Sequence, residues 1–479
     1  MALPAHKTKI VATIGPASDS PAVMEAMLRA GMTIARLNFS HGDFDGHRRV
    51  IANLRRAAAV VGRPVAILAD LPGPKMRIGA IAGEPVELRA GDPFTLTTEA
   101  ITGDARRVSV SFHELPGAVR PGNTLFLADG AIQLEVTAVE GREVICKVEV
   151  GGELRSRKGL NLPGINLGIR AFTDRDRECL AFAMEEGVDA VSQSFVESAA
   201  DIQAVREAAA ASGHTPFVIA KLERSRALDN LEAILDAADG VMVARGDLGV
   251  EIPIEQIAIA QKHILRQANL RGKPVITATQ MLESMTTNRR PTRAEATDVA
   301  NAILDGTDAV MLSGESAMGH YPVESVGMLA RIAQAVERLR PSAWVRDELR
   351  ARTRTDSPSV TDAIALSLDT TVEQLAPAIV VIPTRGGTSA RSVTRFRLPV
   401  WIVAVCDQET TCQQLRFSWG VHPVRQADTS DDWRGFARHF LAEHGIEGRL
   451  ALLSAGPSPR NPGASYRLEV IELDRPSSS

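Results

Sequence analysis

The chain has 479 residues, only four cysteines and a formal net charge of −4. Its length is typical of two to four domains, and a composition of 44% hydrophobic and 23% charged residues excludes global disorder. The mild acidity argues against a protein that mainly binds nucleic acid or a membrane surface. No apolar run reaches the ~18 residues of a membrane-spanning helix, and the N-terminus lacks the pattern of a secretory signal. We therefore expect a cytoplasmic protein.

The cysteines support the same expectation. Cys146, Cys179, Cys406 and Cys412 show neither CxxC nor Cys/His spacing. A disulfide scaffold and a zinc-finger framework are both disfavoured by this pattern, and a reducing compartment fits it.

Short apolar runs rich in β-branched residues recur along the first two thirds of the chain. They are too short for helices and are typical of buried parallel strands. The runs are Lys9–Ile14, Thr33–Phe39, Val65–Asp70, Asp189–Phe195, Phe217–Leu222, Gly240–Ala244, Pro274–Thr279 and Asp308–Leu312. Segments with helical spacing separate them: Ser20–Ala30, Thr173–Glu186, Ala199–Ala211, Ile254–Arg271 and Arg293–Leu304. Eight such units, about 30 residues apart in the second part, predict a TIM barrel rather than an open sheet.

A long insertion follows the third predicted strand. Residues 73–166 carry alternating runs broken by Gly and Asp, which predict a small β-barrel inserted in a barrel loop. These runs are Pro85–Leu88, Pro93–Thr97, Asn123–Phe126, Ile132–Val139 and Glu143–Val150. We expect the TIM barrel to comprise residues 1–72 and 167–340.

Residues 341–479 predict a C-terminal α/β domain. A charged, Arg-rich segment at Trp344–Ser357 precedes a helix-like stretch at Val360–Leu375. Apolar runs follow at Ala378–Ile382, Val400–Val405, Leu450–Leu453 and Tyr466–Leu473. The last five residues, Arg475–Ser479, are expected to fray.

Polar residues end six of the predicted barrel strands. They are Arg36–His41, Asp70, Lys221–Glu223, Arg245–Asp247, Thr279–Gln280 and Ser313–Glu315. Active sites of TIM barrels lie at this edge. The carboxylates of Glu223 and Asp247 suit Mg²⁺ or Mn²⁺, and Arg36 and Lys221 suit a phosphate or carboxylate ligand. The pattern favours metal-assisted phosphoryl transfer or enolate formation, although any one of these charges could instead serve a structural ion pair.

Several motifs, taken together and in order, resemble the pyruvate kinase family. They are Ala35–Gly42, Lys221–Glu223, Val243–Pro253, Ala278–Met285, Pro291–Glu295, Asp298–Ala302, Met311–Ala317 and Gly319–Pro322. The likeness is dense over Lys7–Gly79 and Lys158–Pro322, and thinner in the insertion and the C-terminal third.

The resemblance implies phosphoryl transfer from phosphoenolpyruvate to ADP, giving pyruvate and ATP. Glu223 and Asp247 would hold Mg²⁺ or Mn²⁺, with Asp247 and the Gly246 backbone N–H close to the substrate carboxylate. Lys221 would neutralise the phosphoryl group in transit. Thr279 would order a water or relay beside the carbon that is protonated.

The resemblance also implies roles for three further cations and an assembly state. Arg36 would grip the phosphate, with Arg77 assisting, and would also face the nucleotide. Lys158 would reach the nucleotide from the inserted domain, which would close over the rim and exclude water. Arg77 and Lys158 could instead be loop or surface charges. Members of the family usually form homotetramers, and we expect the same here.

One departure from the family concerns a monovalent cation. Many members hold K⁺ with groups that match Asn38, Ser40, Asp70 and the backbone carbonyl of Leu71. This chain has Leu71 where those members have Thr, and Lys75 where they have Glu. An ammonium fixed at the site could supply the charge that K⁺ provides elsewhere. We therefore expect catalysis without K⁺, as in the family's K⁺-independent branch; the alternative is that Lys75 is a solvated loop charge.

The C-terminal domain carries a loop that matches the effector loop of the family. Small and hydroxyl residues precede an expected helix there, at Thr384, Arg385, Gly386, Gly387, Thr388 and Ser389. Such a loop can hold a phosphate at a helix N-terminus. The resemblance to the family implies that the ligand is a sugar-phosphate or nucleotide effector. The usual Ser-Gly of the family is absent, and a plain turn with a cap explains the same residues.

Two other functions are compatible with part of this pattern. A barrel lyase or aldolase that forms a pyruvate enolate on Mg²⁺ would share the carboxylate pair and the arginine, but would need neither a lid carrying Lys158 nor a nucleotide. A pseudo-enzyme acting as a metabolite sensor is disfavoured by the intact set Arg36, Lys221, Glu223, Asp247 and Thr279. Release of pyruvate that depends on ADP separates the first alternative from a kinase.

Overall fold

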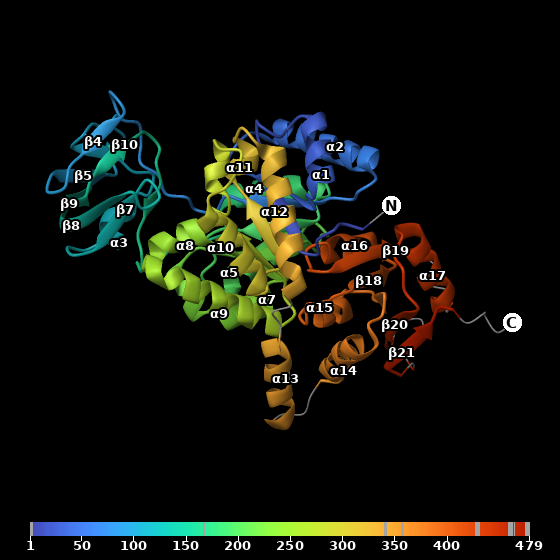
Figure 1. Ribbon diagram of the computed structural model, residues 1–479. Helices are drawn as coiled ribbons and strands as arrows, with labels where there is room; N and C mark the ends of the chain where they lie inside the picture. The colour runs from blue at the N-terminus through green and yellow to red at the C-terminus, as the bar shows by residue number, and fades with distance from the viewer. Residues whose placement is uncertain are drawn as a thin grey trace.

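The computed structural model describes residues 3–165, 168–339, 343–355, 359–426, 432–457, 463 and 465–474. The expected boundaries at 166/167 and 340/341 and the expected frayed end at 475–479 lie outside these residues. Figure 1 shows three bodies: a central barrel with its helices, a β-rich lid to one side and a C-terminal domain to the other.

The central body is a closed barrel of eight parallel strands in the order β1-β16-β15-β14-β13-β12-β3-β2. The strands are β1 (Lys9–Thr13), β2 (Ile34–Asn38), β3 (Ala66–Leu71), β12 (Ala190–Gln193), β13 (Phe217–Leu222), β14 (Gly240–Ala244), β15 (Val275–Ala278) and β16 (Ala309–Leu312). Nearly every residue in them is buried, because the helices cover the outside and side chains fill the inside. The predicted TIM barrel is confirmed.

Helices surround this barrel. They are α1 (Pro21–Ala30), α2 (Phe44–Val61), α4 (Asp174–Glu185), α5 (Ala199–Ala210), α6 (Ser225–Asp229), α7 (Leu231–Ala237), α8 (Arg245–Glu251), α9 (Ile257–Leu270), α10 (Arg293–Leu304), α11 (Gly314–Ala317) and α12 (Pro322–Val336), with 3₁₀ turns at Ile254–Gln256, Glu283–Thr286 and Glu337–Leu339. Capping boxes fix the starts of α4 and α10, at Thr173 with Asp176 and at Thr292 with Glu295. No helix in the described ranges has the length and apolar character needed to cross a bilayer.

The insertion is β-rich, as expected, but it forms two sheets rather than one closed barrel within the described residues. One sheet has the order β11-β7-β8-β9-β5-β6, and β10 pairs with β4 alone. The elements are β4 (Val86–Leu88), β5 (Pro93–Thr97), β6 (Arg107–Ser109), α3 (Leu115–Ala118), β7 (Thr124–Leu127), β8 (Ile132–Glu140), β9 (Glu143–Val150), β10 (Gly152–Leu154) and β11 (Leu160–Asn161). The three-residue strands β4 and β10 pair antiparallel with each other, with Glu87 opposite Glu153. An apolar core of its own supports this lid.

The C-terminal domain is a five-stranded sheet in the order β19-β18-β17-β20-β21, parallel except for β21. Its elements are α13 (Ala343–Thr355), α14 (Val360–Leu375), β17 (Ile379–Pro383), α15 (Thr388–Thr394), β18 (Trp401–Cys406), α16 (Glu409–Leu415), β19 (Val421–Arg425), α17 (Trp433–His444), β20 (Leu450–Ala455) and β21 (Arg467–Glu472). Arg397 fastens this domain to the barrel through a buried ion pair with Asp308 at 2.8 Å. The predicted α/β domain is confirmed.

The cysteine spacing disfavoured a disulfide scaffold, yet the structure contains one disulfide. Cys406, at the end of β18, forms a disulfide with Cys412 on α16. The six-residue separation matches no disulfide motif, but the turn from β18 into α16 brings the two Cα atoms within 6.1 Å. Cys146 and Cys179 are free and buried.

Candidate active site

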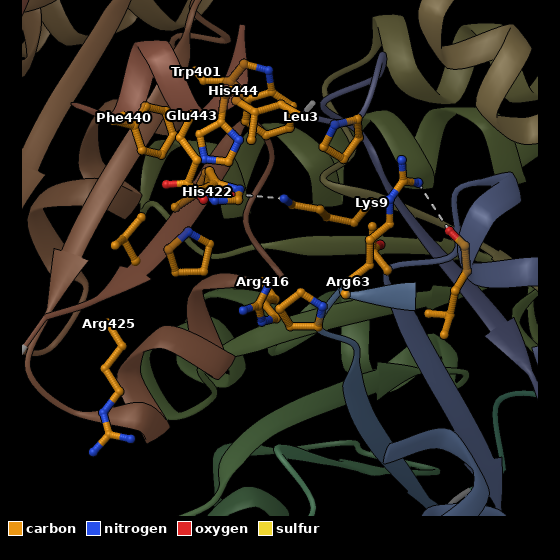
Figure 2. A pocket seen from close by; sticks show the side chains of 18 of the residues that line it. Leu3, Lys9, Arg63, Trp401, Arg416, His422, Arg425, Phe440, Glu443 and His444 are labelled. Carbon is orange, nitrogen blue, oxygen red and sulfur yellow. Dashed lines mark hydrogen bonds between the residues drawn. The ribbon is translucent and has the colours of Figure 1, made fainter. Parts of the chain in front are cut away.

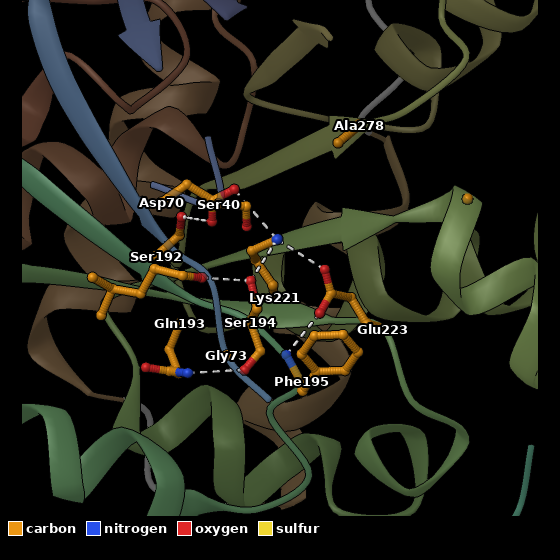
Figure 3. A network of polar contacts seen from close by, with 12 residues as sticks. Ser40, Asp70, Gly73, Ser192, Gln193, Ser194, Phe195, Lys221, Glu223 and Ala278 are labelled. Atoms are coloured by element: carbon orange, nitrogen blue, oxygen red, sulfur yellow. Dashed lines mark hydrogen bonds and ion pairs between the residues drawn. The ribbon is translucent and has the colours of Figure 1, made fainter. Parts of the chain in front are cut away.

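A buried carboxylate, Asp70, organises the charged groups at the C-terminal rim of the barrel (Figure 3). It is the penultimate residue of β3 and is 1% exposed. Its Oδ2 accepts hydrogen bonds from Arg36 Nε at 2.9 Å and from Arg36 Nη2, and pairs with Lys221 Nζ at 3.3 Å. Burial alone would raise the pKa of Asp70, but Lys221 and Arg36 outweigh burial and hold that pKa below its usual value. Asp70 is therefore a fixed anion between two cations.

Lys221 lies between two carboxylates. Its Nζ is 2.8 Å from Glu223 Oε1 and also donates to Ser194 Oγ at 2.7 Å. Burial would lower the pKa of this lysine, but the charges of Asp70 and Glu223 raise it instead. Lys221 is therefore a permanent cation that is only 8% exposed, so its field is weakly screened.

Ser192 on β12 and Ser194 directly after it supply two hydroxyls that the sequence motifs did not identify. Ser192 donates to Asp70 Oδ1 at 2.6 Å, and Ser194 donates to the backbone carbonyl of Leu71 at 2.7 Å. The next residue, Phe195, has a left-handed backbone with φ of 58° and donates its N–H to Glu223 Oε2 at 2.7 Å. The end of β12 thus holds Asp70, Lys221 and Glu223 from one side.

Glu223 and Asp247 form the carboxylate pair expected to hold a divalent cation. Glu223 is 2% exposed, and burial together with the charge of Asp247 raises its pKa against the pull of Lys221. Among the described residues the Asp247 carboxylate has no hydrogen-bond or ion-pair partner. Two neighbouring carboxylate groups, one of them unpaired, fit a hard cation such as Mg²⁺. No group of three or more metal-binding side chains occurs in the described part of the chain, so substrate or water oxygens would have to complete the coordination.

The backbone N–H of Gly246 and the hydroxyl of Thr279 meet beside this pair. Gly246 N donates to Thr279 Oγ1 at 2.7 Å, and that hydroxyl donates to the carbonyl of Ala278 at 2.6 Å. Thr279 adopts a left-handed backbone with φ of 68°, and Arg245 Nη2 donates to its carbonyl at 2.9 Å. The N–H expected to face a substrate carboxylate is therefore held by Thr279, and a bound carboxylate would have to displace that hydroxyl.

Three basic side chains, those of Lys75, Arg77 and Lys158, lie on the segments that connect the lid to the barrel or on the lid itself. Lys75 is exposed, and the charges of Arg77, Lys75 and Arg36 lower the pKa of His41 after burial, which is the main cause. Arg77 Nη1 donates to the carbonyl of Arg157 at 3.1 Å, so its guanidinium rests on the lid backbone. Lys158 follows Arg157 in the connection between β10 and β11, and it is exposed.

The two connections to the lid are anchored to the barrel. Gly73 N donates to Asp176 Oδ1 at 2.9 Å on the outgoing connection, and Gln193 Nε2 donates to the carbonyl of Ala171 at 2.8 Å on the returning one. A cavity of about 170 Å³ lies between these connections, lined by Pro74 and Phe195 among others. Hydrogen bonds to the barrel thus fix both ends of the lid.

Three of the four groups expected to bind a monovalent cation, those of Asn38, Asp70 and Leu71, already have internal partners. Both oxygens of Asp70 and the carbonyl of Leu71 accept hydrogen bonds, and Ser40 N donates to Asn38 Oδ1 at 3.1 Å. The side chain of Ser40 is exposed at the rim.

The expected effector loop is closed by contacts within its own domain. Gly387 N donates to Thr384 Oγ1 at 3.0 Å, and Thr411 Oγ1 donates to the carbonyl of Arg385 at 2.6 Å. Gly386 has open space around it, and Thr388 and Ser389 begin α15, which has seven residues. These contacts form a turn before α15, whose N-cap residue Gly387 has no side-chain cap hydrogen bond.

A larger cavity lies far from the catalytic rim. It has a volume of about 570 Å³ and sits where the N-terminal ends of barrel strands meet the C-terminal domain. Figure 2 shows Lys9, Arg63, Arg416 and His422 around it, together with Trp401 and Phe440. Burial lowers the pKa of Lys9 to about 7, and Lys9 Nζ donates to the carbonyl of Val421 at 2.8 Å.

Comparisons with known proteins identify the family of this chain. Residues 5–326 match the model of the pyruvate kinase barrel domain, and residues 362–470 match that of the pyruvate kinase alpha/beta domain. A pyruvate kinase of Thermococcus litoralis is 50% identical over 430 residues, covering 88% of this chain and 89% of that protein. One of Clostridium acetobutylicum is 42% identical, covering 97% and 99%.

The fold agrees as well. A crystal structure of a pyruvate kinase from Cryptosporidium parvum superposes with a TM-score of 0.89 at 33% identity, covering 98% of this chain and 96% of that one. With both family models matched over most of the sequence, the chain is a phosphotransferase that belongs to the pyruvate kinase family.

Proposed function

We propose that this protein transfers the phosphoryl group of phosphoenolpyruvate to ADP, giving pyruvate and ATP, and that it does so without K⁺. The observation that carries the proposal is the convergence of Arg36, Lys221, Glu223 and Asp247 on one rim of the barrel. Two fixed cations and a carboxylate pair suit a substrate with both a phosphoryl and a carboxylate group.

The residues of the rim have distinct roles in this proposal. Arg36, held by Asp70, grips the phosphoryl group, and Arg77 assists from the lid connection. Lys221 neutralises charge that develops on the phosphoryl group in transit, where a buried cation acts most strongly. Thr279 orients the proton delivery to the enolate carbon and releases the Gly246 N–H to the substrate carboxylate. Arg36 and Lys158 face the nucleotide.

Glu223 and Asp247 hold the divalent cation, Mg²⁺ or Mn²⁺. When bound, that ion would neutralise negative charge on the substrate oxygens. The unpaired carboxylate of Asp247 supports this assignment. So does the pKa of Glu223, which burial raises first and the charge of Asp247 raises further, because a bound cation would offset both effects.

Independence from K⁺ is supported by the position of Lys75. Its charge reaches the rim residue His41, and the oxygens of Asp70 and Leu71 are already engaged by protein donors. The ammonium of Lys75 then supplies the positive charge, and the expected K⁺ ligands Asn38, Ser40, Asp70 and Leu71 serve other contacts.

An assay of ATP formation in tetramethylammonium buffer tests both halves of the proposal. ATP should form from phosphoenolpyruvate and ADP with Mg²⁺ alone, and added K⁺ should change the rate less than about twofold. Lys75→Glu should lower the rate in this buffer and K⁺ should restore it, whereas Lys75→Gln should lower it without restoration. Wild-type activity that vanishes in this buffer and returns with K⁺ would refute the K⁺ half, and pyruvate release without ADP would indicate a lyase.

The remaining assignments are part of the same proposal. The chain divides into a barrel of residues 1–72 and 167–340, a lid of 73–166 and a C-terminal domain of 341–479, and assembles as a cytoplasmic homotetramer. The loop Thr384–Ser389 takes a sugar-phosphate or nucleotide effector. A panel of phosphorylated effectors tests the loop, and sedimentation tests the assembly.

A further inference from the structure

Ser192 is a buried hydroxyl built into the barrel wall beside Asp70. It is fully buried on β12, which pairs in parallel with β3, and the register places Ser192 directly opposite Asp70. The hydroxyl donates to Asp70 Oδ1 at 2.6 Å (Figure 3). The contact follows from strand register, so both side chains emerge on the same face with little freedom to separate.

This contact determines which way the Asp70 carboxylate faces. With Oδ1 held by Ser192, Oδ2 alone points to Arg36 and Lys221. A carboxylate held on one oxygen only could turn about its last bond and present either oxygen. The Ser192 hydroxyl therefore fixes the anion against which both cations are aligned.

The same hydroxyl competes for an oxygen that a monovalent cation would need. Ser194, the residue directly after β12, donates in the same way to the carbonyl of Leu71 at 2.7 Å. The hydroxyls of Ser192 and Ser194 thus contact Asp70 Oδ1 and Leu71 O, two of the expected cation ligands. Ser194 also accepts a hydrogen bond from Lys221, so only Ser192 can be varied without touching a catalytic cation.

We infer that Ser192 is a positioning residue that aligns Arg36 and Lys221 through Asp70 and, by holding Asp70 Oδ1, removes one ligand from a monovalent-cation site. The inference deepens the proposed function, because it names a residue that determines the cation requirement of the same site. Ser192 acts through Asp70 and touches neither substrate nor metal.

Three variants test this role in tetramethylammonium buffer, with and without K⁺. Ser192→Ala removes the hydroxyl, Ser192→Thr keeps it, and Ser325→Ala is the matched control, because Ser325 is also a fully buried serine but lies on α12, where it donates to Tyr321 O. Hydrogen bonds to charged groups are strong enough that we expect kcat of Ser192→Ala to fall about tenfold or more. KM for ADP should stay within about twofold.

The response to K⁺ separates positioning from packing. K⁺ should raise kcat of Ser192→Ala several-fold, because the freed Oδ1 becomes a cation ligand, whereas wild type and Ser325→Ala should not respond. Ser192→Thr should recover kcat to within about threefold of wild type. The inference is overturned if Ser192→Ala keeps wild-type kcat and ignores K⁺, or if it loses activity that neither K⁺ nor the threonine recovers. Failure of the proposed function is a different result: wild type would form no ATP in either buffer.

Discussion

Lys221 offers the sharpest test of how the rim works, because one substitution removes the charge and nearly preserves the shape. In Lys221→Met the thioether occupies the space of the side-chain stem. Asp70 keeps Arg36 as its one cationic partner together with the Ser192 hydroxyl, and Glu223 keeps the Phe195 N–H. The nitrogen that is lost lies 3.3 Å from Asp70 Oδ2 and 2.8 Å from Glu223 Oε1. At an effective dielectric constant of about 20, each attraction is roughly 5–6 kcal/mol before desolvation is subtracted.

Two magnitudes follow from this geometry. Breaking a buried ion pair by removing one partner typically lowers the free energy of unfolding by about 3–5 kcal/mol, because the other charge stays buried. Loss of a cation aimed at charge in the transition state typically lowers kcat about 100-fold or more, which equals roughly 2.7 kcal/mol. We expect both effects in Lys221→Met, with KM for ADP little changed.

The assay is coupled ATP formation at saturating phosphoenolpyruvate and ADP, with thermal unfolding measured on the same preparations. The matched control is Lys262→Met, since Lys262 is 56% exposed and pairs only with Asp305. Surface pairs of this kind contribute about 0–1 kcal/mol, so the control should keep its activity and nearly its full stability. Activity of a folded Lys221→Met variant within about threefold of wild type would refute the electrostatic role of Lys221.

Three further predictions concern other parts of the molecule. Burial lowers the pKa of Lys9 from 10.5 to about 7, so between these pH values Lys9 is protonated in the unfolded chain and neutral in the folded chain. The free energy of unfolding, measured relative to Lys9→Met, should therefore rise by about 1.4 kcal/mol per pH unit between pH 7 and 10.5. Below pH 7 the difference between the two proteins should not change with pH. Parallel denaturation profiles of the two proteins over this range would contradict the burial of Lys9. Gly73→Ala should lower both stability and kcat, because φ is 64° and the new Cβ would lie 2.7 Å from a rim phenyl ring; Gly83→Ala, at φ of 67° with open space, should lower stability alone. Thiol titration of the denatured, unreduced protein should give two thiols, and four after reduction, if Cys406 and Cys412 are paired; four thiols without reductant would favour the reducing compartment expected from the sequence.

The sequence was most informative where burial is complete on both faces of a strand. All eight barrel strands lie within one or two residues of the predicted runs, because apolar β-branched runs between helical segments leave few alternatives. The helix α14 spans the predicted residues Val360–Leu375. The strand β19 was missed, because His422 and Arg425 interrupt its apolar character.

The contacts within the site could be predicted from the sequence less well than the residues that make them. Ser192 and Ser194 look like ordinary strand serines, and their importance comes from a register between strands that are 122 residues apart in the chain. The contact between the Gly246 N–H and Thr279 likewise depends on two left-handed residues at the end of β15. The disulfide could not be predicted for a similar reason, because a turn rather than a sequence motif brings Cys406 close to Cys412.

The lid also matters for how the barrel can fold. β3 and β12 are neighbours in the closed barrel, yet 118 residues separate Leu71 from Ala190. The bridge between Arg77 and Gly159 ties the two ends of the lid together, so a folded lid leaves roughly 35 residues of effective loop and lowers the entropy cost of pairing β3 with β12 by about 1 kcal/mol. A lid that folds early on its own core should therefore speed barrel closure, and substitutions in that core should slow refolding of the whole enzyme.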